Sequence, residues 1–239
     1  MKAFIFSIIL FITPQICLSE EKLVAGLFNI VPYAYEENNK VVGITTEIIE
    51  SIKEDSSLEI KMILMPYRRM LKELKSGKID FAIFFLSDYS NTFSYNLISL
   101  YDLDTVVIGK KTLTIHSFDD LYHIRLATPL GVNYNKGLAN NKKLNIHYVR
   151  DYKNAILMLK KGNIDAIIAP SKILEYQLGL MGMNINELGE PYILTTNTAW
   201  IQFSHKSTLQ KYKPLLIETA QKLLEEDRVI QIIRKYYPD

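Results

Sequence analysis

Side chains that commonly carry out catalysis are few in this sequence. His116, His123, His147 and His205 lack the spacing of metal-ligand motifs, and Cys17 is the only cysteine. The sequence contains no glycine-rich phosphate loop and no nucleophile-elbow pattern. We therefore predict no catalytic residue, no metal site and no cofactor. A hydrolase or dehydratase built on the same elements remains the alternative, because activity depends on the site rather than on the fold.

Three residues near the start could instead contact a small molecule. Tyr33 and Tyr35 follow the first predicted strand, where an aromatic ring could stack on a ligand, although packing beside Pro32 would explain both equally well. Glu47 stands in the first turn of a predicted helix. It could bind a cationic group there, or it could simply favour the positive end of the helix dipole. We take Tyr33, Tyr35 and Glu47 as candidate ligand-binding residues.

Two further groups follow other predicted strands. Phe85 and Ser87 stand at the carboxyl end of an apolar run, where side chains can reach a ligand. Gly131, Asn133 and Tyr134 follow the predicted strand at 124–128 and precede a predicted helix. Backbone N–H groups of this loop could receive an anion, and Tyr134 could cover the ligand.

The composition narrows the class of protein. The chain has 239 residues, of which 48% are hydrophobic, so it can bury one large core or two medium ones. This excludes a disordered tail, a disulfide-stapled miniprotein and a collagen-like repeat. With 28 Lys and Arg against 26 Asp and Glu, the net charge is only +2. We expect no nucleic-acid partner, because such proteins carry a clear basic excess.

Short apolar runs alternate with amphipathic segments, which predicts an α/β fold with helices covering a mainly parallel sheet. Thr45 and Thr46 are predicted to cap the first helix. Asp151 is predicted to cap a later one. The predicted strands are 23–28, 59–64, 81–85, 124–128 and 145–149, and two predicted helices are 66–75 and 151–160.

One part of the sequence occurs twice. Residues 74–83 (LKSGKIDFAI) match residues 159–168 (LKKGNIDAII). In both copies lysines end a helix, glycine supplies the left-handed exit, and an Ile-Asp pair leads into an apolar strand. The repeat predicts two similar α/β lobes. Asp80 and Asp165 are predicted to be structural, since a carboxylate after a glycine turn usually accepts local N–H groups.

Two extended segments, 105–110 and 198–204, are predicted to connect the lobes, and helices within 214–236 should return to the first lobe. Two such connections have the geometry of a hinge, with a ligand site between rigid lobes. We predict that lobe 1 comprises residues 20–106 and 199–239 and that lobe 2 comprises residues 107–198.

The first residues have the plan of a secretory signal peptide. Lys2 is followed by an apolar run, Pro14 interrupts it, and Cys17 and Ser19 are small residues suited to a cleavage site. The run is too short for a membrane span, which needs about 20 apolar residues. We predict a signal peptide at 1–19 and export of the remainder.

The chain resembles the type-3 family of bacterial extracellular solute-binding proteins, which includes periplasmic amino-acid receptors of ABC importers. The resemblance spans about residues 23–236 and rests on the order and spacing of several motifs. It implies a periplasmic-binding-protein fold of type II, with two similar α/β lobes joined by a two-strand hinge. The motifs are VPYAY at 31–35, VGITTE at 42–47, FDDL at 118–121, IIRKYY at 232–237 and the repeated Gly-x-Ile-Asp turn.

The chain departs from amino-acid receptors of this family at two charged anchors. Thr92 stands where the arginine for the ligand carboxylate is expected, and Pro170 stands where the aspartate for the ligand ammonium is expected. The sequence PYRRM at 66–70 resembles a subgroup with a Pro-aromatic-x-Arg motif. This resemblance implies that Tyr67 and Arg69 contact the ligand, with the Arg69 guanidinium as substitute anion clamp. A solvated cation in the first helical turn would explain Arg69 equally well.

The resemblance implies a protein that captures a small polar ligand, amino-acid-like or another small anionic or polar metabolite, between its lobes. It would present this ligand to the membrane subunits of an ABC importer. A ligand-sensing module for a membrane signalling partner is the alternative. We expect a monomer located in the periplasm.

Overall fold

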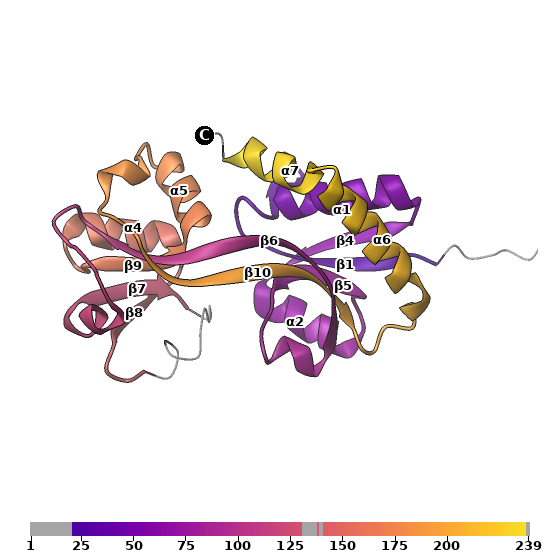
Figure 1. Ribbon diagram of the computed structural model, residues 1–239, viewed down its shortest axis with the longest axis horizontal. Coiled ribbons are helices and arrows are strands. Elements are labelled where there is room, and N and C mark those ends of the chain that lie inside the picture. Colours follow the sequence, from indigo (N-terminus) through magenta and orange to yellow (C-terminus); the bar gives the residue numbers. More distant parts are fainter. Residues whose placement is uncertain (1–20, 131–137, 139–140, 238–239) are drawn as a thin grey trace, which may run out of the picture.

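The computed structural model describes residues 21–130, 138 and 141–237. These residues form two α/β lobes joined by a pair of long strands (Figure 1). The predicted signal peptide at 1–19 and the candidate residues Gly131, Asn133 and Tyr134 lie outside the described residues. Within the described ranges, each helix is too short or too polar to cross a bilayer.

The first lobe is built on three parallel strands. β1 (Leu23–Phe28) lies between β4 (Ile60–Met65) and β5 (Phe81–Phe85). β5 is apolar and almost entirely buried, as a strand covered on both faces requires. The other elements of the first lobe are α1 (Ile44–Ser56), α2 (Tyr67–Ser76), α6 (Lys213–Glu225), α7 (Arg228–Tyr236) and the hairpin of β2 (Tyr35–Glu37) and β3 (Lys40–Val42).

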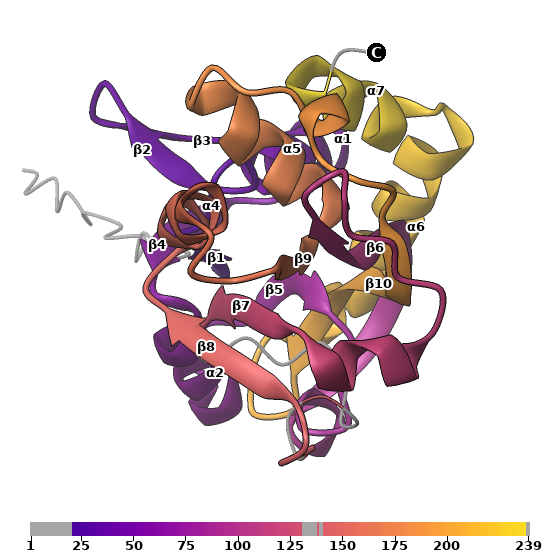
Figure 2. The same cartoon turned by 90° about the vertical axis from the view of Figure 1, so that its left-hand side faces the viewer.

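The second lobe repeats this plan. β7 (Arg125–Pro129) lies between β8 (Asn145–Val149) and β9 (Ala166–Pro170), and all three are parallel. α4 (Tyr152–Lys161) leads from β8 to β9 as α2 leads from β4 to β5, and α5 (Ser171–Leu180) follows. Figure 2 shows this lobe from its outer end. The prediction of a two-lobed α/β fold is confirmed.

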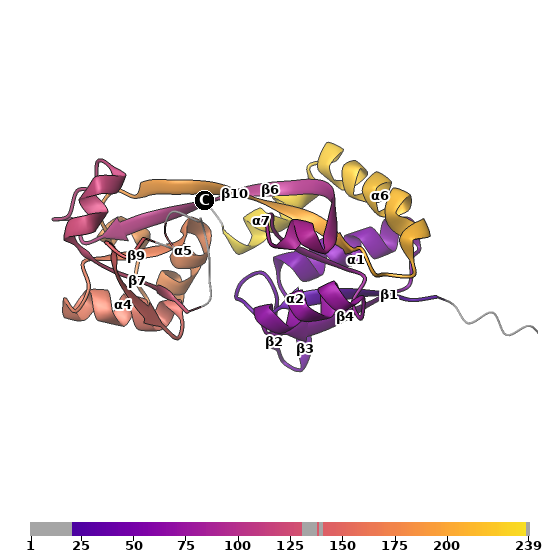
Figure 3. The same ribbon diagram turned by 90° about the horizontal axis from the view of Figure 1, so that it is seen from below.

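Two long antiparallel strands connect the lobes. β6 (Ser94–Gly109) pairs with β10 (Tyr192–Ser204) over almost the full length of both. They run along one side of the molecule, whereas β2, β3, α2 and α4 lie on the other side (Figure 3). Both exceed the crossing segments predicted at 105–110 and 198–204, because a continuous ladder satisfies the backbone hydrogen bonds of the connection. The sheet, in the order β4-β1-β5-β10-β6-β9-β7-β8, is therefore mixed rather than mainly parallel.

The prediction that Thr45 and Thr46 cap the first helix is wrong. α1 begins after Gly43, whose φ of 125° belongs to a region that favours glycine. The carbonyl oxygens of Pro32 and Tyr33 accept the N–H groups of Ile44 and Thr45 at 3.0 and 2.8 Å. The preceding loop therefore satisfies the first N–H groups of the helix, and both threonines lie buried within its first turn.

The helix ends in the two copies of the repeat have the glycine exits that the sequence predicts. Gly77 and Gly162 both adopt left-handed backbone conformations, with φ of 81° and 75°. Each donates its N–H to carbonyl groups of the preceding helical turn. At the start of α4, the Asp151 side chain accepts the N–H of Asn154 at 2.8 Å, which confirms the predicted cap.

Asp80 and Asp165 occupy equivalent places in the two lobes. Asp80 accepts the backbone N–H of Val24 at 2.7 Å and the hydroxyl of Ser207 at 2.5 Å. Asp165 accepts the backbone N–H of Arg125 at 2.7 Å and two further bonds from its guanidinium. Both carboxylates thus tie the turn before one buried strand to the start of the neighbouring strand, which confirms their structural role.

Candidate functional site

The carboxyl ends of the parallel strands in the two lobes point toward each other. β6 runs from the first lobe to the second, and β5 runs in the same direction because both are antiparallel to β10. β9 is antiparallel to β6 and therefore runs back toward the first lobe. Loops at the carboxyl ends of such strands are the usual ligand-binding segments of α/β sheets. The candidate site is therefore the region between these facing strand ends.

Tyr67 lies at this edge of the first lobe, directly after β4 and Pro66. Its ring meets Phe28 edge-on at 5.4 Å and Phe84 at 6.3 Å between centroids. Partial burial raises the pKa of the Tyr67 hydroxyl to about 12, so the group stays neutral and can donate a hydrogen bond. The two phenylalanines hold the ring in place, and Tyr67 offers a fixed aromatic surface with a polar tip.

Arg69 stands two residues further along α2 and is only loosely held. Its Nε lies 3.9 Å from a carboxylate oxygen of Glu73, and its side chain is 67% exposed. Such an exposed pair contributes little to stability. The guanidinium is thus free to reorient toward an anionic group, and its role as anion clamp stays a prediction.

Ser87 and Thr92 direct their hydroxyl groups to their own turn. Ser87 Oγ accepts the N–H of Ser90 and lies 3.1 Å from the Ser90 hydroxyl. Thr92 Oγ1 donates to the carbonyl of Tyr89 at 2.7 Å. Phe85 is half-buried at the end of β5. Thr92 therefore supports the turn at the position where family receptors are expected to carry an arginine.

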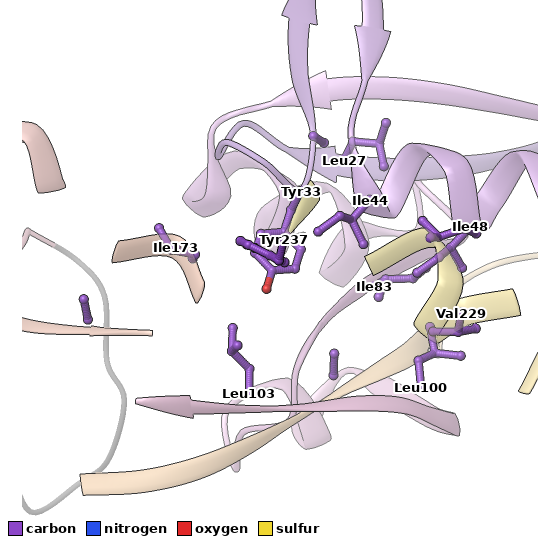
Figure 4. Packing of buried hydrophobic residues seen from close by; sticks show 14 of the residues in the cluster. Leu27, Tyr33, Ile44, Ile48, Ile83, Leu100, Leu103, Ile173, Val229 and Tyr237 are labelled. Atoms are coloured by element: carbon purple, nitrogen blue, oxygen red, sulfur yellow. The ribbon is translucent and has the colours of Figure 1, made fainter. Parts of the chain in front are cut away.

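Tyr33 is placed among buried side chains. Its ring is stacked on Tyr101 of β6 at 6.1 Å between centroids, and burial raises its pKa well above the ordinary value. Tyr237 packs beside it, and Ile173 of α5 lies across from both (Figure 4). The Lys172 ammonium lies 5.5 Å from the Tyr237 ring. Tyr33 thus belongs to an apolar contact between the lobes beside the crossing strands.

Tyr35 and Glu47 have partners within the protein. Burial and a hydrogen bond with Tyr176 of α5 raise the pKa of Tyr35 to about 12, which links β2 to the second lobe. Glu47 accepts bonds from the Lys235 ammonium at 2.6 Å and the Tyr236 hydroxyl at 2.7 Å. Partial burial alone would raise the pKa of Glu47, but these two bonds outweigh it and lower the pKa. Its charge is therefore already balanced by α7.

Two buried threonine hydroxyls were not anticipated as site groups. Thr46 in the first turn of α1 and Thr128 near the end of β7 have no hydrogen-bond partner for Oγ1 within the described residues. A buried hydroxyl without a partner is costly, so a ligand or water that bonds to it would be favoured. Thr128 lies near the carboxyl end of a predicted strand, and this position in the sequence could have identified it as a candidate site residue. Pro170, buried at the end of β9, supplies no charge.

No group of three His, Cys, Asp or Glu side chains with metal-binding geometry exists in the described ranges. A shallow depression on one face of α6 lies apart from the strand ends. The depression is therefore not part of the candidate site between the strand ends. The residues lining the depression are Pro214, Ile217, Glu218, Gln221, Lys222 and Glu225.

Comparison with known proteins agrees with this geometry. Residues 24–111 match the sequence model of the bacterial extracellular solute-binding proteins, family 3. The Bacillus subtilis (strain 168) protein named "Probable amino-acid-binding protein YxeM" is 22% identical over 86% of this chain and 80% of its own length.

Two solved structures share the fold. One is a histidine kinase sensor domain described as similar to periplasmic binding proteins, with a TM-score of 0.77 and 15% identity over 92% of this chain and 97% of that one. The other is the arginine-, lysine-, histidine-binding protein ArtJ of Geobacillus stearothermophilus, with a TM-score of 0.71 and 16% identity over 92% and 96%. The first part of the chain is therefore similar in sequence to family 3 of the bacterial extracellular solute-binding proteins, and the two lobes share the fold of these solved structures.

Proposed function

We propose that this protein captures a small polar ligand between its two lobes and presents it to a membrane transporter. The observation that carries the proposal is the opposed orientation of β5 and β9, which points the carboxyl ends of both lobes at one shared region. β6 and β10 are the connections about which the lobes would move. The ligand would stabilise the closed form by the difference between its affinities for the closed and open forms.

The ligand class follows from the relatives and from the residues at the strand ends. YxeM and ArtJ are named for amino-acid ligands, which supports an amino-acid-like molecule. Thr92 and Pro170 leave no charged anchor at the two usual positions. A zwitterion bound there without compensation would lose a few kcal/mol for each unpaired charge. We therefore assign the anionic group to Arg69 and the stacked part of the ligand to Tyr67.

The remaining candidates have subordinate roles in this proposal. Phe85 and Ser87 border the ligand at the end of β5, whereas Gly131, Asn133 and Tyr134, which lie outside the described residues, stay proposed ligand contacts from the sequence alone. Tyr33, Tyr35 and Glu47 shape its wall through their own contacts with β6, α5 and α7. We place the lobe boundaries within the crossing strands, with residues 20–106 and 199–239 in lobe 1 and residues 107–198 in lobe 2.

The proposed location is supported by the match of residues 24–111 to a family of extracellular solute-binding proteins. We propose that residues 1–19 are a cleaved signal peptide and that the mature protein is a periplasmic monomer. Its partners would then be a small molecule and the membrane subunits of an ABC importer. We also propose that it converts no substrate, which incubation with a metabolite pool and mass spectrometry of the products would test.

A ligand-sensing role is the second candidate. It is favoured by the structural similarity to a histidine kinase sensor domain, whose TM-score is 0.77. Deletion of the gene separates the two roles. Loss of ligand uptake supports transport, whereas unchanged uptake with a lost transcriptional response to the ligand supports sensing.

The first experiment is mass spectrometry of small molecules released from purified, denatured protein, followed by titration calorimetry with the identified compound. Arg69→Ala should weaken an anionic ligand at least about tenfold, the cost of one charge-assisted hydrogen bond. The matched control is Arg68→Ala, which removes the same charge from the neighbouring position of α2. Equal affinity of Arg69→Ala and the unmodified protein would remove Arg69 from the site.

A further inference from the structure

One face of α2 is strongly basic. Arg68, Lys72 and Lys75 follow each other at spacings of four and three residues, so they form a single stripe along the helix. All three are exposed, and they lie opposite the buried Met70 and Leu74. No partner within the described structure covers this stripe with acidic side chains, since Glu73 is paired with Arg69 and Lys78 beside it.

Further cations and two exposed tyrosines extend the stripe at the end of α2. The Lys75 ammonium lies 5.5 Å from the ring centroid of Tyr89, and the Lys213 ammonium lies 3.8 Å from that of Tyr95. Tyr89 and Tyr95 are 56% and 44% exposed. A Cβ atom added at Gly77 would lie 2.8 Å from the carbonyl oxygen of Lys206, so this lysine stands at the same end of the helix. We call this surface the basic face: Arg68, Lys72, Lys75, Lys78, Lys206 and Lys213 with Tyr89 and Tyr95.

The fold does not require a basic surface at this place. The equivalent helix of the second lobe, α4, has Lys153 and Lys160 where α2 has Arg68 and Lys75. Between them the exposed Leu157 replaces Lys72. The whole chain carries a net charge of only +2, so the six cations of the basic face are a local concentration of charge.

We propose that the basic face of lobe 1 docks on an anionic phospholipid surface. Clusters of four to eight Lys and Arg residues attract anionic headgroups, and tyrosine rings favour the boundary between headgroups and hydrocarbon. The predominance of lysine favours lipid over an acidic protein, because lysine is depleted in the cores of protein interfaces. Five of the six cations of the face are lysines. Asp88, which precedes Tyr89 in the sequence, is an exposed acidic residue beside the basic face.

A membrane contact through α2 would be compatible with movement of the two lobes. Docking through α2 would hold the protein against the membrane while the crossing strands β6 and β10 stay free to bend. The proposal does not depend on which ligand is bound or on whether one is bound, and it can be tested with ligand-free protein.

The test is cosedimentation of the full chain with vesicles of phosphatidylglycerol mixed with phosphatidylcholine, compared with vesicles of phosphatidylcholine alone. Binding to the anionic vesicles is expected, and added salt should weaken it. Each basic residue near the surface changes partitioning about fivefold, so Lys72→Gln combined with Lys75→Gln should reduce binding about 25-fold. Lys72→Glu with Lys75→Glu should reduce it further. Unchanged thermal unfolding of the variants would show that they remain folded.

The matched control is Lys153→Glu with Lys160→Glu on α4, which changes the net charge by the same amount and should retain most of the binding. No binding of the unmodified protein to anionic vesicles would overturn the proposal. Equal losses in the α2 and α4 variants would also overturn it, because the attraction would then belong to the whole surface. Binding to soluble poly-glutamate without binding to vesicles would overturn it in favour of an acidic protein partner.

Discussion

The substitution Asp165→Asn removes a charge that the second lobe uses structurally. The carboxylate accepts the backbone N–H of Arg125 at 2.7 Å and bonds from its guanidinium at 2.7 and 3.0 Å. The asparagine side chain would keep one acceptor oxygen but neither the charge nor the bidentate geometry. The contact joins the turn before β9 to the start of β7, so its loss should weaken the second lobe.

The size of the effect follows from the carboxyl pKa. Hydrogen bonds from the Arg125 side chain and backbone lower the pKa of Asp165 from 3.8 to about 2. If fully realised, this lowering is equivalent to about 2.4 kcal/mol of stability. The Asp165 side chain is 35% exposed, so screening by water reduces the expected loss to about 1 kcal/mol. Because the pKa is depressed in the folded state, this contribution is present above pH 3.8 and disappears as the pH falls toward about 2.

Urea unfolding followed by circular dichroism measures this loss directly. Asp165→Asn should lower the free energy of unfolding at about pH 7, and its difference from the unmodified protein should shrink as the pH falls below about 4. Asp119→Asn, at an exposed position, is the control for loss of one negative charge. Ligand affinity should stay unchanged. Equal stability of Asp165→Asn and the unmodified protein at neutral pH would refute the reasoning, as would a difference between them that is independent of pH.

Two further predictions concern the site and its support. Tyr67→Ala should weaken ligand binding about fivefold through loss of ring contact, whereas Tyr67→Phe should keep most of the affinity; calorimetry showing equal affinity in all three proteins would contradict the stacking role. Gly43→Ala should destabilise the protein by about 2 kcal/mol or more, because φ is 125° and the new Cβ would lie 2.5 Å from the Tyr33 carbonyl oxygen. Gly179→Ala, where a Cβ meets open space, should be neutral or stabilising in the same thermal unfolding assay, and equal losses in both variants would contradict the strain argument.

Local sequence signals predicted much of the fold. β1, β5 and β8 have the predicted bounds, and β4 and β7 differ by one residue at each end. The Asp151 cap and the glycine exits at Gly77 and Gly162 are as expected. These features depend on residues within a few positions of one another, so a local pattern is sufficient to specify them.

The Thr45 and Thr46 cap failed for a non-local reason. Backbone carbonyls of Pro32 and Tyr33, more than ten residues upstream, satisfy the first N–H groups of α1. A side-chain cap was therefore unnecessary there. The crossing strands were underestimated for a related reason, because each is extended by pairing with the other, about a hundred residues away in the sequence.

The repeat, the α/β alternation and the family motifs could all be identified from the order of the residues, because helix and strand periodicity and tight turns are encoded locally. The partners of the candidate site residues could not. Tyr33 stacks on Tyr101, and Glu47 bonds to Lys235 and Tyr236 almost two hundred residues later. Such partners meet only when the chain is folded, and burial and pairing then govern which charges and rings remain available. Tyr67 and Arg69 were already candidates from the sequence motif, but only the tertiary structure showed that Tyr67 is held by Phe28 and Phe84 and that Arg69 is exposed and loosely paired.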